Sequence, residues 1–164
     1  MSPVRFVADA MLKKLARWLR IFGAETDFLD RPDNDILAFL KKHPSRILLT
    51  QDVQLHERAG LRRLRSFLVP RDTTTEEQVA AVLRHFQLSL DDFPARTICP
   101  SCNGRLVIVG KKEAEGKVLP EVLARHEQFW LCEKCGKAYW EGTHWKRISE
   151  AAEKISRMLA EAKR

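Results

Sequence analysis

The stretch VRFVADAMLKKLARWLR, residues 4–20, decides the fold of the N-terminal part of the chain. Its first residues, 4–8, form a short, mostly apolar run typical of a buried strand, and Asp9 follows directly. From Ala10 to Phe22 apolar residues recur at helical spacing, and Gly23 is a residue type that commonly ends a helix. A strand followed at once by an amphipathic helix is how a parallel α/β unit begins.

The same alternation continues to about residue 95. It predicts further strands at 26–29, 46–50 and 66–69, and helices at 35–42, before Gly60 and at 75–87. Asp33 is placed to cap the helix at 35–42, and Thr75 with Gln78 forms a capping box for the helix at 75–87. The order βαβαβαβα predicts an α/β fold, a parallel sheet flanked by helices.

The composition changes after a linker at Asp91 to Arg96. All four cysteines lie beyond it in two C-x-x-C pairs: Cys99, Cys102, Cys132 and Cys135. Two such pairs predict a closed tetrahedral zinc site, although the same spacing occurs in redox motifs. The spacer has room for strands at 105–111 and 128–131 and a short helix at 120–127. We expect a small zinc ribbon in which the ion holds the fold and performs no chemistry.

The last segment and the overall composition indicate the setting of the protein. Residues 148–164 place an apolar stripe on one helical face, which would dock on the body or on a protein partner. The 45% hydrophobic and 31% charged composition is that of a soluble globular protein, and no membrane span or signal peptide is predicted. We therefore expect a cytoplasmic location, where cysteines more often bind metals than form disulfides. The net charge of +7 favours a polyanionic partner.

Four aspartates are placed to meet at one edge of the predicted sheet. Asp9 and Asp52 follow strands, and Asp33 and Asp35 open the helix between them. Such a cluster is unfavourable unless cations neutralise it, and carboxylate oxygens suit Mg²⁺ or Mn²⁺. Ions so held activate water and orient a phosphodiester, which is nuclease chemistry. Singly, Asp33, Asp35 and Asp52 also fit capping or helix-dipole roles, whereas an unpaired Asp9 would be costly.

Basic residues accompany this acidic cluster. Lys13, Arg17 and Arg20 fall at i, i+4 and i+7 beside Asp9, away from the apolar stripe of their helix. They are candidates for holding phosphates, or they form an ordinary solvated face. A second basic cluster has the same two interpretations: Arg58, Arg62, Arg63, Arg65 and Arg71.

Several of these stretches together resemble one known family. They are Phe6 to Arg20, Asp33-Asn34-Asp35-Ile36-Leu37, Leu48-Leu49-Thr50-Gln51-Asp52, and Phe129 to Trp145. The chain resembles, over about residues 4–147, the PIN-like ribonuclease domain found at the C-terminus of Mut-seven-type exonucleases and in free-standing prokaryotic proteins. Gln51 stands where that family usually has arginine, and Asn34 replaces a common acid. The family's Gly-Ser-His-Trp motif is Gly142-Thr143-His144-Trp145 here, which leaves His144 open to an RNA contact, an acid role or a packing role.

The resemblance implies a PIN fold, metal-dependent cleavage of RNA and an appended zinc ribbon. It matches Asp9, Asp33, Asp35 and Asp52 to the family's acids. We therefore expect a PIN-like nuclease domain at 1–95, a zinc ribbon at 96–147 and a terminal helix at 148–164. The leading hypothesis is a ribonuclease that uses Mg²⁺ or Mn²⁺ at the aspartates, with its RNA held by Lys13, Arg17 and Arg20. The alternatives are a non-catalytic RNA- or ribosome-binding protein and a toxin-like nuclease restrained by a partner.

Overall fold

A four-stranded parallel sheet forms the body of the protein, whose computed structural model describes residues 3–163. The strands lie in the order β2-β1-β3-β4. Their bounds are β1 (Arg5–Asp9), β2 (Thr26–Leu29), β3 (Arg46–Thr50) and β4 (Ser66–Leu68). The predicted parallel α/β fold is therefore confirmed, with β2 and β3 at the residues expected.

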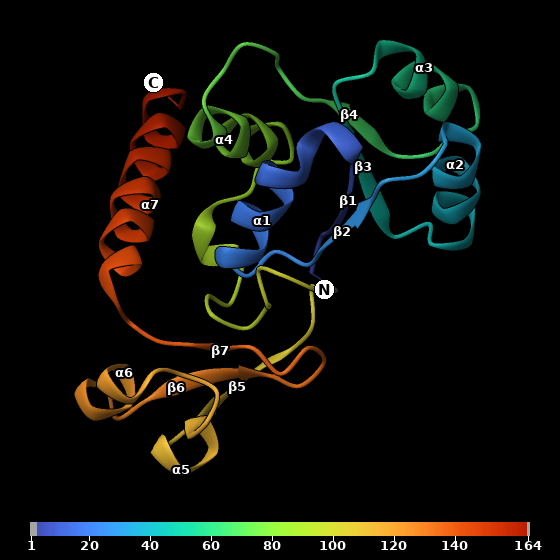
Figure 1. The fold of residues 1–164 in the computed structure, drawn as a ribbon. Helices are drawn as coiled ribbons and strands as arrows, with labels where there is room; N and C mark the ends of the chain where they lie inside the picture. The colour runs from blue at the N-terminus through green and yellow to red at the C-terminus, as the bar shows by residue number, and fades with distance from the viewer. Residues whose placement is uncertain (1–2, 164) are drawn as a thin grey trace.

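Helices cover both faces of this sheet, because alternate residues of each buried strand point to opposite sides. The helices are η1 (Ala10–Leu12), α1 (Lys13–Ile21), α2 (Asp33–Lys42), α3 (Val53–Leu61), α4 (Thr75–His85) and η2 (Leu90–Asp92). Phe6 and Ala8 pack with α1 and α4 in one core cluster, and Val7 packs with α2 and α3 in a second. Figure 1 shows α1 and α4 on one side of the sheet and α2 and α3 on the other.

Two predicted helix caps differ from the structure. Helix α2 begins at Asp33 with Pro32 as its N-cap, so Asp33 is a helical residue and caps nothing. The capping box of α4 is formed by Thr74 and Glu77, one residue before the predicted pair. Both alternatives match the capping-box pattern, and the charged Glu77 carboxylate accepts the stronger hydrogen bond from the backbone N–H.

The segment predicted as a linker packs onto the body. Phe93 is buried in the core cluster beneath α1 and α4. Gly23, with φ of +93°, ends α1 at a point where a Cβ would lie 2.3 Å from the Pro94 carbonyl oxygen. Glycine is therefore required there both by the backbone conformation and by the close approach of the linker.

A second, antiparallel sheet follows in the order β5-β6-β7. Its strands are β5 (Leu106–Val109), β6 (Phe129–Cys132) and β7 (Ala138–Tyr139), with α5 (Lys111–Ala114) and α6 (Pro120–Arg125) between β5 and β6. Figure 1 shows this small sheet below the parallel one. The predicted strands and the helix near 120–127 are present, whereas the two-residue β7 is too short to leave a sequence pattern.

The terminal helix α7 (Thr143–Glu161) runs alongside α4. It begins five residues before the predicted start at Ile148, and the predicted end at Arg164 lies outside the described residues. Ile155 is fully buried against the body, and Arg84 Nη2 donates to the Met158 carbonyl oxygen at 3.2 Å. The apolar stripe thus docks on the body. None of the helices within residues 3–163 has the length and apolarity needed to cross a membrane.

Candidate active site and cysteine metal centre

Asp9 lies at the carboxyl end of β1, where it is only 6% exposed. Its Oδ2 accepts a short hydrogen bond from the Thr50 hydroxyl, and its Oδ1 accepts one from the Met11 amide at 3.3 Å. Burial raises the pKa of Asp9, the two hydrogen bonds oppose that shift, and the charges of Asp52 and Asp33 add to it. Asp9 is therefore a buried carboxyl group with two acidic neighbours.

Thr50 connects Asp9 to Asp52 at the ends of neighbouring strands. The Thr50 side chain is fully buried, and its Oγ1 accepts a hydrogen bond from the Asp52 amide at 3.0 Å. Asp52 in turn caps α3, because its Oδ1 accepts from the Leu55 amide at 3.1 Å. The hydroxyl thus fixes the side chain of one acid and the backbone of the other.

Asp33 approaches this edge from the start of α2. Its Oδ2 accepts from Arg58 Nη1 of α3 at 3.0 Å, and Asn34 Oδ1 accepts from the other guanidinium nitrogen. Asp35 is exposed two residues further along α2, and residues two apart on a helix do not face each other. Asp52 and Asp33 are thus the acids whose charges raise the pKa of Asp9, and Asp35 is not among them.

The four cysteines converge at the ribbon. Their sulfur atoms all lie within 4.8 Å of one another, with 3.7 Å between Cys99 and Cys135 and 3.4 Å between Cys102 and Cys132. Sulfur atoms at the corners of a tetrahedron around zinc are ~3.8 Å apart, given a Zn–S distance of ~2.3 Å. Within residues 3–163 this is the only set of three or more Cys, His, Asp or Glu side chains that converges so closely. The donor set and spacing fit a four-thiolate zinc ion.

The backbone next to the cysteines donates hydrogen bonds to a sulfur atom and leaves room for it. The amides of Lys134 and Cys135 both donate to Cys132 Sγ at 3.4 Å, which favours a thiolate. A Cβ at Gly104 would lie 2.9 Å from the same sulfur, so only glycine fits in the first turn. Both turns can therefore present their sulfurs to one ion.

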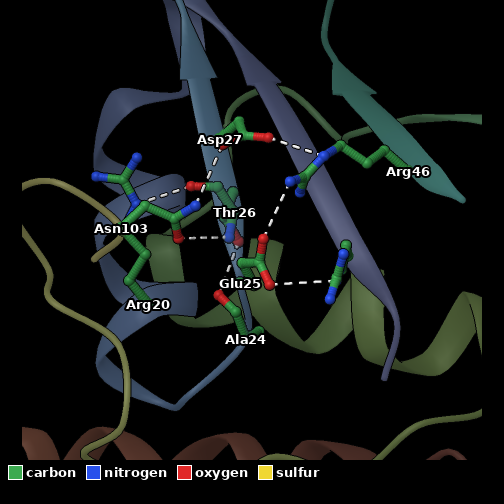
Figure 2. Close-up of polar contacts among 8 residues, drawn as sticks. Arg20, Ala24, Glu25, Thr26, Asp27, Arg46 and Asn103 are labelled. Carbon is green, nitrogen blue, oxygen red and sulfur yellow. Dashed lines mark hydrogen bonds and ion pairs between the residues drawn. The ribbon is translucent and has the colours of Figure 1, made fainter. Parts of the chain in front are cut away.

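The first cysteine turn is also attached to the edge of the parallel sheet. Asn103 accepts a hydrogen bond from the Thr26 amide at 2.9 Å and donates to Asp27 Oδ1 at 3.2 Å. Arg20 Nε donates to the Thr26 carbonyl at 2.8 Å, and its Nη1 donates to the Pro100 carbonyl at 3.1 Å. Figure 2 shows Asn103 and Arg20 meeting at β2, beside the ion pairs of Arg46 with Glu25 and Asp27. The cysteine centre is thereby held to the body.

The variant Asn103→Gly is expected to lower the free energy of unfolding by about 1–3 kcal/mol, because the buried Thr26 amide loses its acceptor. Asn103 has φ of +65°, which glycine adopts without strain, so the change isolates the lost side chain. Urea unfolding followed by circular dichroism measures the effect. Asp72→Gly is the control and should be near neutral, because Asp72 is exposed and has a similar φ of +55°. Equal stability of Asn103→Gly and wild type would contradict this role.

Lys13 and Arg17 are exposed on α1, whereas Arg20 is only 8% exposed. The guanidinium of Arg20 donates to two backbone carbonyls and thereby packs against the first cysteine turn. Its predicted contact with RNA stays a prediction. A groove of about 570 Å³ lies between α1 and that turn, and its basic lining residues are Lys13, Lys14, Arg17 and Arg20. No acidic side chain lines this groove.

The aromatic residues of the ribbon divide into packed and exposed ones. Trp130 is 6% exposed, and the Arg96 guanidinium lies 3.8 Å from the centre of the Trp145 ring. Trp130 is therefore packed inside the ribbon and Trp145 is packed against Arg96, while Trp140 is 36% exposed. His144 is exposed at the start of α7, which does not fit the packing role among the three considered for it.

Two residues of this edge were missed as site residues by the sequence analysis. Thr50 was noted only within a motif, although a threonine two residues before Asp52 at a strand end was the available signal. Arg58 was grouped with other arginines, and its pairing with Asp33 joins helices distant in sequence. The sequence position of Arg58 does not indicate that its side chain would reach Asp33.

The parallel sheet, its acidic carboxyl edge and the clustered cysteines define an α/β protein with a small ribbon whose four cysteines lie at metal-binding distance. The chain belongs to the Mut7-C RNAse domain family, which it matches over residues 4–152. It is 32% identical over 101 residues to the exonuclease mut-7 homolog of Homo sapiens, a match that covers 60% of this chain. The matched part is 12% of the length of that relative. No solved structure matches the chain. Family membership supports a nuclease-type function.

Proposed function

We propose that this protein is a metal-dependent ribonuclease whose active site is the acidic edge of the parallel sheet. The observation that carries the proposal is the buried Asp9 carboxyl group, linked through Thr50 to Asp52 and facing the charge of Asp33. Burying a charged carboxylate costs free energy unless it is paired or neutralised, and perturbed pKa values gather at functional sites. Membership of an RNAse domain family gives the reaction class.

The residues of the edge have distinct roles in this proposal. Asp9 and Asp52 would hold Mg²⁺ or Mn²⁺ through oxygen ligands, with Asp33 as a further ligand or a charge beside them. When bound, such an ion supplies an activated water and offsets the charge of the phosphodiester. Thr50 orients the Asp9 carboxylate, and Arg58 holds Asp33 at the start of α2. Asp35, which we also expected to be a catalytic residue and metal ligand, stays a prediction.

The RNA backbone would reach the acidic edge along α1. Lys13 is the first residue of α1, a few residues after Asp9, and shares the basic groove with Arg17 and the first cysteine turn. Lysine and arginine neutralise phosphates and give binding a strong salt dependence. The zinc held by the four cysteines would stabilise the outer wall of this groove, which is how the ribbon aids RNA binding.

The purified protein is expected to cleave single-stranded RNA with added Mn²⁺ or Mg²⁺ and to stop when EDTA is added. Gel analysis of end-labelled RNA measures cleavage, and zinc content measured on the same samples separates loss of the catalytic ion from loss of the structural one. Excess Mn²⁺ should restore cleavage. RNA binding without cleavage under any of these metals would instead support the non-catalytic RNA-binding alternative.

Three further expectations stay proposals. The division at residues 1–95, 96–147 and 148–164 is a proposal about domains. A cytoplasmic location is proposed from the four free cysteines, since reducing compartments keep thiols available for zinc. A protein partner on the C-terminal helix would have to use the face of α7 that the body leaves exposed.

A further inference from the structure

A second groove, of about 620 Å³, lies on the other side of α1, between that helix, the start of α4 and α7. Nothing in the proposed cleavage chemistry uses it. Its volume is that of a typical small-molecule or nucleotide pocket. Lys14 and Arg17 line both this groove and the one beside the first cysteine turn, so the two grooves meet across the exposed ridge of α1.

The floor of this groove is apolar and contains an aromatic ring. Trp18 and Ile21 of α1 face Ile148 and Ala151 of α7. Trp18 is half-buried, with its ring centre 5.6 Å from that of Phe22, so the core fixes the ring while part of it stays open. A fixed, accessible indole is a platform on which a nucleobase stacks.

The rim of the groove is mainly basic. It carries Lys14, Arg17, Arg147 and Lys154, with His144 at the start of α7. None of these four cations forms an ion pair among the residues that the structure describes. Two carboxylates, Glu76 and Glu150, also line the groove; they repel phosphates and accept hydrogen bonds from the amino groups of bases.

We propose that the groove between α1 and α7 binds a nucleotide of single-stranded RNA, with its base stacked on Trp18 and the flanking phosphates on Arg17, Arg147 and Lys154. This proposal depends on the proposed ribonuclease function in one respect, namely that the bound polyanion is RNA. It gives α7 a role, because this helix forms the wall opposite α1, and His144 of the Gly142-Thr143-His144-Trp145 motif lies in that wall. RNA lying along Lys13 and Arg17 would continue over the ridge of α1 into this groove.

Single-stranded RNA fits these features better than the other polyanions. A duplex keeps its bases stacked inside and presents mainly backbone, so it would gain nothing from Trp18. An acidic peptide would meet Glu76 and Glu150 with like charge. Bases of a single strand can leave the stack and use an aromatic floor, while the phosphates follow the rim.

The first test uses Trp18→Leu, which keeps an apolar side chain against Phe22. Its affinity for a fluorescein-labelled single-stranded RNA should fall about fivefold to about 150-fold, the range expected when one base–aromatic stack is lost. Trp18→Phe should keep most of the affinity. RNA with one abasic nucleotide at the stacked position should bind wild type more weakly, whereas Trp18→Leu should not distinguish it from intact RNA.

The second test removes charge without touching the core. Arg147→Gln with Lys154→Gln should weaken binding and reduce the slope of log affinity against log salt by about 1.4, as expected for two lost phosphate contacts on a single strand. The control is Lys146→Gln with Arg157→Gln, two exposed cations of the same helix that do not line the groove. This control carries the same charge change and should keep a near wild-type slope.

All affinities are measured in the Asp9→Asn background without added divalent metal, so cleavage does not enter. Duplex RNA and a polyglutamate peptide serve as competitors, and neither should displace the labelled strand efficiently. The proposal is overturned if Trp18→Leu and the Arg147/Lys154 pair bind like wild type, or if the control pair loses as much as the test pair. If Asp9→Asn loses cleavage but still binds RNA in this groove, the acidic edge and the groove are functionally distinct sites.

Discussion

We expect Asp9→Asn to lower the rate of RNA cleavage by at least about a thousandfold while the protein stays folded. Removing one carboxylate from a site for a hard divalent ion removes several kcal/mol of charge stabilisation, and each ~1.4 kcal/mol is a factor of ten in rate. The amide keeps an oxygen that can still accept from Thr50 or from the Met11 amide. The local structure should therefore survive the loss of charge.

The same substitution has a stability signature that depends on pH. Burial raises the pKa of Asp9 above its value in an unfolded chain, so in the interval between the two values the folded protein binds more protons. The free energy of unfolding consequently falls as pH rises through this interval. Asparagine has no charge to bury, so Asp9→Asn should be more stable than wild type at neutral pH. This advantage should disappear below the usual pKa range of aspartate.

These expectations are measured by RNA cleavage with Mn²⁺ and by thermal unfolding at neutral and acidic pH. Asp91→Asn, an exposed change in η2 away from the acidic edge, is the matched control and should behave like wild type in both assays. Cleavage by Asp9→Asn at the wild-type rate would remove Asp9 from the active site. Lower stability at neutral pH would show that its charge is stabilising, contrary to the sign argued here.

The sequence predicted the parallel sheet well because its strands are buried on both faces, and continuous apolar runs such as Arg46 to Thr50 leave a clear pattern. Helix ends were less accurate. Three successive threonines, Thr73 to Thr75, stand at the start of α4, so two capping boxes fit the pattern equally. Pro32 took the N-cap position that the pattern assigned to Asp33, because its extended backbone leads directly into the first turn.

The parts of the site that depend on contacts between distant segments of the chain could not be predicted from the sequence. Asp9 and Asp52 were placed correctly because both directly follow buried strands that are neighbours in the sheet. Helical spacing grouped Arg20 with Lys13 and Arg17, yet Arg20 turns to the Pro100 carbonyl of a segment far along the chain. The cysteines were located by spacing alone, whereas the contact of Asn103 with β2 depends on how the ribbon meets the body.

Cys132→Ser is expected to unfold the ribbon and release its zinc, which is the largest structural effect we predict. The ribbon is small, and its fully buried side chains include Phe129 of β6 and Ala114 of α5. Zinc binding to comparable small peptides contributes about 10–16 kcal/mol, as much as the whole stability of an ordinary domain. Without the ion, the thiols left behind cannot hold β5, β6 and β7 together.

The body should survive this loss. The core clusters on both faces of the parallel sheet contain no ribbon residue, and α7 is held to α4 by Ile155 and Ala151. Hydrogen exchange should therefore speed up across residues 97–139 while β1, β3 and α4 keep their protection. RNA affinity should fall, because the first cysteine turn forms one wall of the basic groove, and the acidic edge should still bind Mn²⁺.

The measurement combines zinc content by atomic emission, hydrogen exchange by mass spectrometry and binding of Mn²⁺. Lys134→Ala, an exposed change between the two cysteines of the second turn, is the control and should retain one zinc per chain. A Cys132→Ser protein that loses zinc but keeps its ribbon protected would show that the apolar contacts alone hold the small sheet. Loss of protection throughout the body would instead mean that the Asn103 and Arg20 contacts with β2 couple both parts into one cooperative unit.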